Sequence, residues 1–232
     1  MNAVLQVDHL YKSFGSNHVL KDFNMRLGKG ENIAVLGKSG SGKSVLIKCI
    51  VRLVDAEQGS IRVLNEEMQD LSNEALDAIR SKIGFLFQSN ALYDSMTVRE
   101  NLEFPLRRHR VEKELVPEEV EKHTIDMMPS ELSGGMRKRI ALARTLILRP
   151  EIILYDEPTT GLDPITSREI SELINKIQQQ YQTSSIIISH DLSCIRATAD
   201  RVIMLIDGCR YAEDTVENLQ NSEDPRIKEF FL

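Results

Sequence analysis

A glycine-rich stretch near the N-terminus has the residues and spacing of a loop that binds phosphate. It runs from Gly37 to Ser44, reads GKSGSGKS, and follows the apolar run Ile33 to Leu36. Glycines let the backbone curl so that successive N–H groups point inward, and the start of the following helix adds partial positive charge. Lys43 supplies a full charge, and the Ser44 hydroxyl suits Mg²⁺. The sequence therefore predicts a P-loop, a motif that kinases, GTPases and ATPases share.

Two adjacent carboxylates end a second apolar run. Ile152 to Tyr155 are followed directly by Asp156 and Glu157. Because successive side chains on a strand point to opposite sides, the two carboxylates can take different roles. We expect Asp156 to hold the shell of a bound Mg²⁺ and Glu157 to polarise an attacking water. A solvated acidic pair at a strand end would have the same sequence, and the P-loop earlier in the chain favours the catalytic interpretation.

A third motif lies between these two. Residues 132–139 read LSGGMRKR and precede a helical pattern. This segment resembles the signature of the ABC ATPases, in which serine and glycine at a helix N-terminus bind the γ-phosphate of ATP held by the other subunit. The resemblance implies that Ser133, Gly134 and Gly135 act on the nucleotide of a second copy. Taken alone, a serine cap followed by glycines would suit any helix.

The other parts of the ABC ATPase site occur in the order typical of that family. Gln88 corresponds to the glutamine of the Q-loop, Asp163 in Gly-Leu-Asp to the D-loop, and His190 to the switch histidine. Phe14 stands where the family stacks an aromatic ring on adenine, and Tyr11 is a second candidate. Each residue has an ordinary structural explanation, but their joint occurrence between Phe14 and His190 identifies the chain as a member of the family.

The resemblance implies an ATPase that uses ATP and Mg²⁺ and in which two copies, head to tail, clamp the nucleotide. It assigns catalysis to Glu157, His190, Lys43 and Gln88, and metal binding to Ser44, Gln88 and Asp156. It assigns ATP binding to Phe14, Gly37, Lys38, Ser39, Gly40, Ser41, Gly42, Lys43, Ser44 and Val45. From the other copy it adds Ser133, Gly134, Gly135 and Asp163.

These motifs need a scaffold that brings them to one place. Short apolar runs alternate with helical patterns, at Ile83 to Phe87, Ile152 to Tyr155, Ile186 to Ser189 and Val202 to Ile206. This pattern predicts an α/β fold with a mainly parallel sheet, buried on both faces, whose ligand lies at the carboxyl ends of the strands. The P-loop NTPase fold of the ABC ATPases adds an N-terminal antiparallel β subdomain and an inserted α-helical subdomain.

We interpret the chain, residues 1–232, as a single ABC-type ATP-binding domain. The helical insert is expected at about 89–150 and a C-terminal tail at about 212–232. Between Phe104 and Ser133 the insert is shorter than in the family by about one helix of ~10–14 residues. Either the insert is trimmed or a segment is missing, and trimming would affect permease docking and not ATP binding.

Finer features resemble the Mla/Mce-type ATPases, which energise lipid or phospholipid movement. They are Val45 after the P-loop serine, Met136 in the signature, and the segments 104–107, 128–132 and 162–166. The resemblance implies a multispanning membrane permease as partner, docked near Gln88 and residues 90–104. A periplasmic lipid-binding protein and a small STAS-like subunit are further implied partners.

The end of the chain carries an aromatic pair, Phe230 and Phe231. An exposed pair of this kind could anchor the tail on the partner subunit, as in the Mla/Mce-type ATPases. A tail that folds back on its own domain explains the same residues. The sequence leaves both alternatives open.

Composition and the lengths of the apolar runs limit which partners and which cellular location we expect for the protein. A net charge of −6 argues against a protein whose main partner is nucleic acid. The N-terminus lacks the pattern of a signal peptide, and the apolar runs fall far short of the ~20 residues of a membrane span. We therefore expect a cytoplasmic protein, peripheral on the cytoplasmic face of the inner (plasma) membrane. The alternative is an ABC ATPase that drives no transport, such as a cell-division ATPase.

Overall fold

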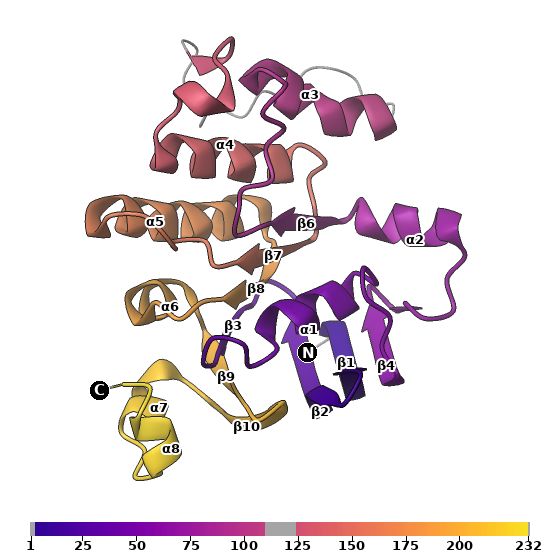
Figure 1. The fold of residues 1–232 in the computed structure, drawn as a ribbon, viewed down its shortest axis with the longest axis vertical. Helices are drawn as coiled ribbons and strands as arrows, with labels where there is room; N and C mark the ends of the chain where they lie inside the picture. The colour runs from indigo at the N-terminus through magenta and orange to yellow at the C-terminus, as the bar shows by residue number, and fades with distance from the viewer. Residues whose placement is uncertain (1–2, 110–123, 232) are drawn as a thin grey trace.

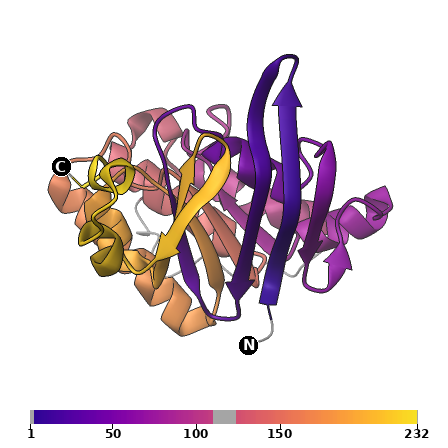
Figure 2. The ribbon, with the colours of Figure 1, turned by 90° about the horizontal axis from the view of Figure 1, so that it is seen from below.

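The computed structural model describes residues 3–109 and 124–231, which form two sheets with helices around them (Figure 1). The first sheet is antiparallel, with the strand order β2-β1-β4-β5. Its strands are β1 (Ala3–Phe14), β2 (Asn17–Gly28), β4 (Gln58–Val63) and β5 (Glu66–Glu67). Figure 2 shows β1 and β2 as a long hairpin that extends beyond the rest of the molecule.

The second sheet has the order β10-β9-β3-β8-β7-β6, and every neighbouring pair in it is parallel except β10 with β9. Its strands are β3 (Asn32–Leu36), β6 (Ile83–Leu86), β7 (Ile152–Asp156), β8 (Ser184–Ile188), β9 (Arg201–Ile206) and β10 (Cys209–Asp214). The α/β class, the mainly parallel sheet and the antiparallel N-terminal sheet predicted from the sequence are confirmed.

The central strands are apolar along their whole length because both faces of the sheet are covered. In β7, Ile152 and Leu154 join a core that also contains residues of α1 and of the antiparallel sheet. Ile153 and Tyr155 point to the other face and pack with residues of α4 and α5. This alternation is the period of two that a strand imposes, and it buries all five residues of β7.

The helices complete the layers. They are α1 (Lys43–Ile50), α2 (Asn73–Arg80), α3 (Val98–His109), α4 (Gly134–Leu146), α5 (Pro164–Tyr181), α6 (Leu192–Thr198), α7 (Val216–Gln220) and α8 (Pro225–Lys228), with a 3₁₀ turn η2 (Pro129–Glu131). Helix α1 shares a core with both sheets, and α4 contacts both α3 and α5 (Figure 1). Helices α3 and α4 therefore lie at the end of the molecule opposite α7 and α8.

Within the expected helical insert, the described residues include α3 and share a small core of their own. Val98, Leu102 and Leu106 of α3 are buried against residues of α4 and of the segment before it. The proposed shortening of the insert falls largely on residues 110–123, outside the described residues. The limits of the insert and of the tail stay predictions.

The C-terminal tail folds onto its own domain. Ile227 is buried, and Phe230 and Phe231 are partly buried against a core that includes residues of β3 and β9. Of the two alternatives for these phenylalanines, this structure contains the intrachain one. Across residues 3–109 and 124–231, no helix combines the length and the apolar character that crossing a membrane requires.

Candidate active site

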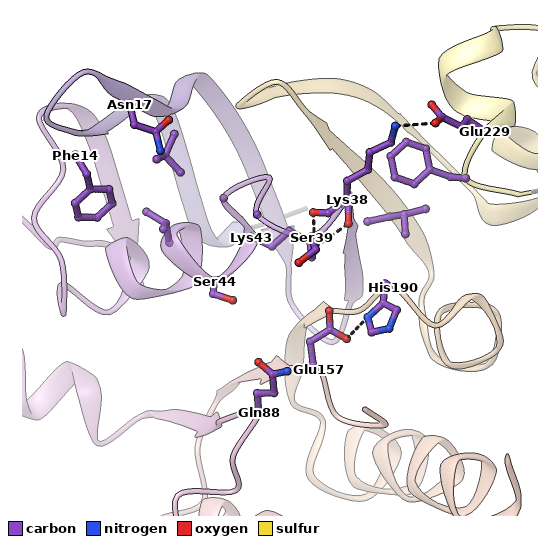
Figure 3. Close-up of a pocket in the computed structure, with 17 residues that line it drawn as sticks. Phe14, Asn17, Lys38, Ser39, Lys43, Ser44, Gln88, Glu157, His190 and Glu229 are labelled. Atoms are coloured by element: carbon purple, nitrogen blue, oxygen red, sulfur yellow. Dashed lines mark hydrogen bonds and ion pairs between the residues drawn. The ribbon is translucent and has the colours of Figure 1, made fainter. Parts of the chain in front are cut away.

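Parallel strands bring the predicted motifs to one edge of the second sheet. The P-loop follows β3, Gln88 follows β6, Asp156 ends β7 with Glu157 directly after it, and His190 follows β8. A cavity of about 800 Å³ opens there (Figure 3). Its lining consists of Phe14, Asn17, Val19, Leu36, Gly37, Lys38, Ser39, Gly40, Gly42, Lys43, Ser44, Val45, Gln88, Glu157, His190, Glu229 and Phe230. The volume lies within the usual range of ~300–1,000 Å³ for small-molecule sites.

The P-loop has the conformation that its glycines allow. Gly42 precedes the first residue of α1 and has a φ of 104°, and a Cβ there would lie 2.8 Å from Val19 Cγ1. Lys43 is buried, and its Nζ donates to the carbonyl oxygens of Gly37 at 2.7 Å and Lys38 at 3.1 Å. Burial lowers the pKa of Lys43, and the carboxylates of Glu157 and Asp156 oppose that shift. The ammonium is thus held inside the loop that faces the cavity.

The first carboxylate of the acidic pair contacts the P-loop serine. Ser44 Oγ donates to Asp156 Oδ1 at 3.1 Å. Burial raises the pKa of Asp156, while the hydrogen bond from Ser44 acts in the opposite direction. A hydroxyl and a carboxylate side by side form the hard oxygen pair that Mg²⁺ prefers.

The second carboxylate has an unusual backbone conformation. Glu157 has a φ of 53°, in the left-handed region that non-glycine residues rarely adopt, and it precedes a proline. Its N–H donates to the carbonyl oxygen of Ile188 at 2.8 Å, which fixes this conformation. Strain of this kind costs about 1–3 kcal/mol and is found most often at functional sites. It directs the Glu157 side chain into the cavity (Figure 3).

Two side chains orient the Glu157 carboxylate. His190 Nδ1 lies 2.8 Å from Glu157 Oε2, and the Thr160 hydroxyl donates to the same oxygen at 3.0 Å. An ionised carboxylate only accepts hydrogen bonds, so the contact is a hydrogen bond from His190 to Glu157 when Nδ1 carries a proton. The His190 side chain is 66% exposed and that of Glu157 is 11% exposed, so the histidine lies on the open side of the pair.

The signature and D-loop residues lie elsewhere. Within the described part of the chain, Ser133, Gly134, Gly135 and Asp163 are absent from the cavity lining. Ser133 caps α4 by accepting from the N–H of Met136, and Asp163 caps α5. A Cβ on Gly135 would lie 2.7 Å from Thr166 Cγ2, so the starts of the two helices are packed together. Of the residues predicted to act within one chain, Ser41 and Asp156 are absent from the lining formed by the described residues as well, but Ser41 lies between Gly40 and Gly42 and Asp156 contacts Ser44. The other residues predicted to act within one chain line the cavity, and those predicted to act in a second copy do not.

The structure distinguishes the two aromatic candidates for adenine stacking. Phe14 lines the cavity and is 51% exposed, with the ammonium of Lys12 5.0 Å from its ring centroid. Tyr11, on the same strand, is absent from the lining formed by the described residues. Phe14 is thus the better placed of the two.

We predict that Phe14→Ala raises the Kd for ATP about tenfold, because stacking on a base contributes ~1–3 kcal/mol. Tyr11→Ala is the matched control and should change the Kd less than twofold. Isothermal titration with ATP measures both variants. A larger loss in Tyr11→Ala than in Phe14→Ala would contradict the assignment.

Sequence reasoning missed part of the lining. Asn17 and Val19, just after Phe14, contribute to it, and so do Glu229 and Phe230 from the far end of the chain. The Lys38 ammonium, predicted to contact ATP, is paired with the Glu229 carboxylate at 2.7 Å (Figure 3). The short spacing from Phe14 could have indicated Asn17 and Val19. The sequence around Glu229 does not predict its position at the cavity, because the tail reaches this position only through tertiary packing.

A family model described as ABC transporter matches residues 20–160. The chain belongs to the ABC transporter family. It is the ATP-binding subunit of such a transporter and an ATPase. A related ABC protein is the probable ribonucleotide transport ATP-binding protein mkl of Mycobacterium leprae, which is 36% identical over 239 residues, covering 99% of this chain and 69% of the relative.

Two further ABC proteins are similar along nearly the whole chain. The intermembrane phospholipid transport system ATP-binding protein MlaF of Haemophilus influenzae is 35% identical over 236 residues, covering 98% of this chain and 89% of the relative. The ATP-binding cassette MJ0796, solved as a dimer in a post-hydrolysis state bound to ADP and Pi, superposes with a TM-score of 0.81 and 31% identity. That match covers 91% of this chain and 98% of MJ0796, and it confirms the ABC ATPase fold.

Proposed function

We propose that two copies of this chain clamp ATP head to tail and that each active site is completed by the partner. The separation of Ser133 and Asp163 from the cavity supports this arrangement, since neither contributes to the site of its own chain. The dimeric state of the related cassette MJ0796 supports it as well. Ser133 and Gly135 of one copy would then meet the γ-phosphate on the P-loop of the other.

In this mechanism the chain works by positioning groups and stabilising charge. The P-loop N–H groups and Lys43 hold the phosphates, and Phe14 holds the base. Glu157 accepts a hydrogen bond from the attacking water and draws its proton away from the forming bond. His190 lies beside Glu157 through its Nδ1, and its other ring nitrogen, Nε2, would face the γ-phosphate, where a proton on Nε2 would stabilise developing negative charge.

We propose Mg²⁺ as the metal of this site, with Ser44, Asp156 and Gln88 as the residues that would hold it. Ser44 and Asp156 are in contact, and Gln88 lines the same cavity. Among the described residues no group of three or more His, Cys, Asp and Glu side chains could hold a metal. This suits Mg²⁺, which protein sites usually bind through one or two side chains together with substrate phosphates. When bound, the ion neutralises phosphate charge.

We further propose that the chain drives a separate multispanning permease, from the cytoplasmic face of the inner membrane, and that the cargo is lipid. The similarity to MlaF over 98% of the chain supports this cargo, together with the Mla/Mce-type residues around the signature. A periplasmic lipid-binding protein and a STAS-like subunit are proposed further partners.

An exposed aromatic pair supports the proposed place of permease docking. Tyr93 and Phe104 are 44% and 37% exposed, and their ring centroids lie 4.9 Å apart. Tyr93 follows Gln88 by five residues in the chain, so a permease element bound here would be connected to the ATP site through the intervening backbone. Paired exposed aromatic rings are common anchors in protein interfaces.

The test is purification of the complex from its own cells by a tag on this chain, followed by lipid mass spectrometry. We expect a multispanning permease and bound phospholipid, and Tyr93→Ala should release the permease while leaving ATP binding intact. A permease with ribonucleotides and no lipid would overturn the lipid proposal and favour the cargo that the name of mkl suggests. Recovery without any permease would favour an ABC ATPase that drives no transport, such as a cell-division ATPase.

A further inference from the structure

A lysine of helix α4 is buried although no motif assigns it a role. Lys138 is 2% exposed and ranks among the largest fully buried side chains of the described residues. Its Nζ donates to the carbonyl oxygen of Gln88 at 3.3 Å. Burial lowers the pKa of Lys138, while the carboxylates of Asp156 and Glu157 oppose the shift through their charge. The ammonium therefore binds the backbone of Gln88, and the negative charges of Asp156 and Glu157 stabilise its charged form.

Packing alone does not explain a lysine at this position. Removing an ammonium from water costs several kcal/mol even after relaxation, whereas a methionine of similar length would fill the same space at no such cost. The ammonium gains one hydrogen bond to a carbonyl and no ion pair within 4.0 Å among the described residues. A function for the Lys138 ammonium at this position would explain why a lysine is buried there despite the free-energy cost of removing its charge from water.

Helix α4 holds the next residues of the same loop as well. Arg144 donates to the carbonyl oxygens of Ala91 at 2.7 Å and Asn90 at 3.1 Å. Asn90 and Ala91 have φ values of 63° and 50°, a conformation that non-glycine residues keep only when neighbouring groups fix it. The backbone of residues 88–91, which we term the Q-loop segment, is thus fixed at three carbonyl oxygens by two cations of α4.

The fixed backbone determines where the Gln88 side chain lies. This side chain comes from the end of β6, enters the ATP cavity and points toward Glu157 (Figure 3). The carbonyl oxygen of Gln88 is bonded to the carbon next to its Cα. If this oxygen loses its hydrogen bond from Lys138, the backbone of Gln88 can rotate and its side chain can move. A misplacement of about 1 Å at a catalytic site can reduce the rate 100-fold.

We propose that Lys138 is a positioning residue of the ATPase, whose ammonium holds the Gln88 backbone so that the Gln88 side chain stays opposite Glu157. The inference rests on the proposed role of Gln88 at the metal. It also makes α4 the element that connects the signature at Ser133, expected to meet the partner's ATP, with the ATP site of its own chain.

The first variant is Lys138→Met, which keeps the length of the side chain and removes the ammonium. We expect kcat to fall about tenfold or more and KM for ATP to stay within about twofold, because Lys138 does not line the cavity and the P-loop still holds the phosphates. Lys176→Met, an exposed lysine on the neighbouring helix α5, is the matched control and should keep wild-type kinetics. Thermal unfolding of all variants shows whether each is folded.

A double-mutant cycle with Gln88→Ala separates positioning from a structural role. If Lys138 acts through Gln88, Lys138→Met should lower kcat less than about twofold once Gln88 is alanine. An equal loss in both backgrounds, or a loss explained by a fall in Tm, would overturn the inference. If Lys138→Met has the wild-type kcat while Gln88→Ala is slow, the inference about Lys138 is overturned and the proposed role of Gln88 stands. Wild-type kcat in Gln88→Ala would overturn the role of Gln88 and the inference with it.

Discussion

Glu157→Gln should bind ATP with nearly wild-type affinity and hydrolyse it about 10²–10⁴-fold more slowly. Glutamine has the shape of glutamate, so it can keep the hydrogen bond from Thr160, but it cannot accept a proton from water. Because the γ-phosphate is then not released, the ATP-clamped pair should accumulate. Steady-state phosphate release measures the rate, and size-exclusion chromatography with and without ATP measures the dimer.

The matched control for this variant is Glu151→Gln. Glu151 lies just before β7, whose other end carries Asp156 and Glu157, and its carboxylate is paired with Lys82 on the surface. The control removes one negative charge at the opposite end of the same strand and should turn over like the wild type. Wild-type turnover in Glu157→Gln would remove Glu157 from the role of water activator.

Lys43→Ala should lose most of the affinity for ATP. Hydrogen bonds between charged groups contribute about 1.5–3 kcal/mol each, so an ammonium that donates two of them to phosphate oxygens accounts for about 100-fold or more in Kd. The loss is expected in Kd itself, before any effect on turnover, because Lys43 is buried in the loop that encloses the phosphates. Isothermal titration calorimetry with ATP measures it directly.

Lys48→Ala is the control for charge on the same helix. Lys48 belongs to α1 as Lys43 does, but it is exposed and does not line the cavity formed by the described residues. It should bind ATP within about twofold of the wild type. Equal losses in the two variants would indicate that long-range attraction, and not contact through Lys43, governs ATP binding.

Much of the fold was predictable because the central strands are apolar without interruption. A run such as Ile152 to Tyr155 can be stable only where both faces of a sheet are covered, and short runs of this kind separated by helices favour parallel pairing. Parallel pairing in turn places the residues after β3, β6, β7 and β8 at one edge. The meeting of the P-loop, Gln88, Glu157 and His190 follows from this rule and from their positions after strands.

The antiparallel sheet was predictable only through the family resemblance. Its strands β1 and β2 alternate between buried and exposed residues with several irregular steps in register, so the period of two is interrupted. The strand order β2-β1-β4 requires β4 to pair with β1 across more than forty intervening residues. Pairing at such a distance is decided by the packing of α1 and the core beneath it, which local sequence does not encode.

By itself the sequence determined the chemistry of this protein: a phosphate loop, an acidic pair and a signature, each recognisable because its function requires particular residue types at fixed spacing. Only the tertiary structure decided that Glu229 reaches Lys38 and that Lys138 supports the backbone of Gln88. Those contacts join residues 191 and 50 positions apart, and nothing in their local sequence distinguishes them from solvated charges. The burial of Lys138 and the proximity of Glu229 to Lys38 arise only when the chain packs, and therefore only the tertiary structure shows them.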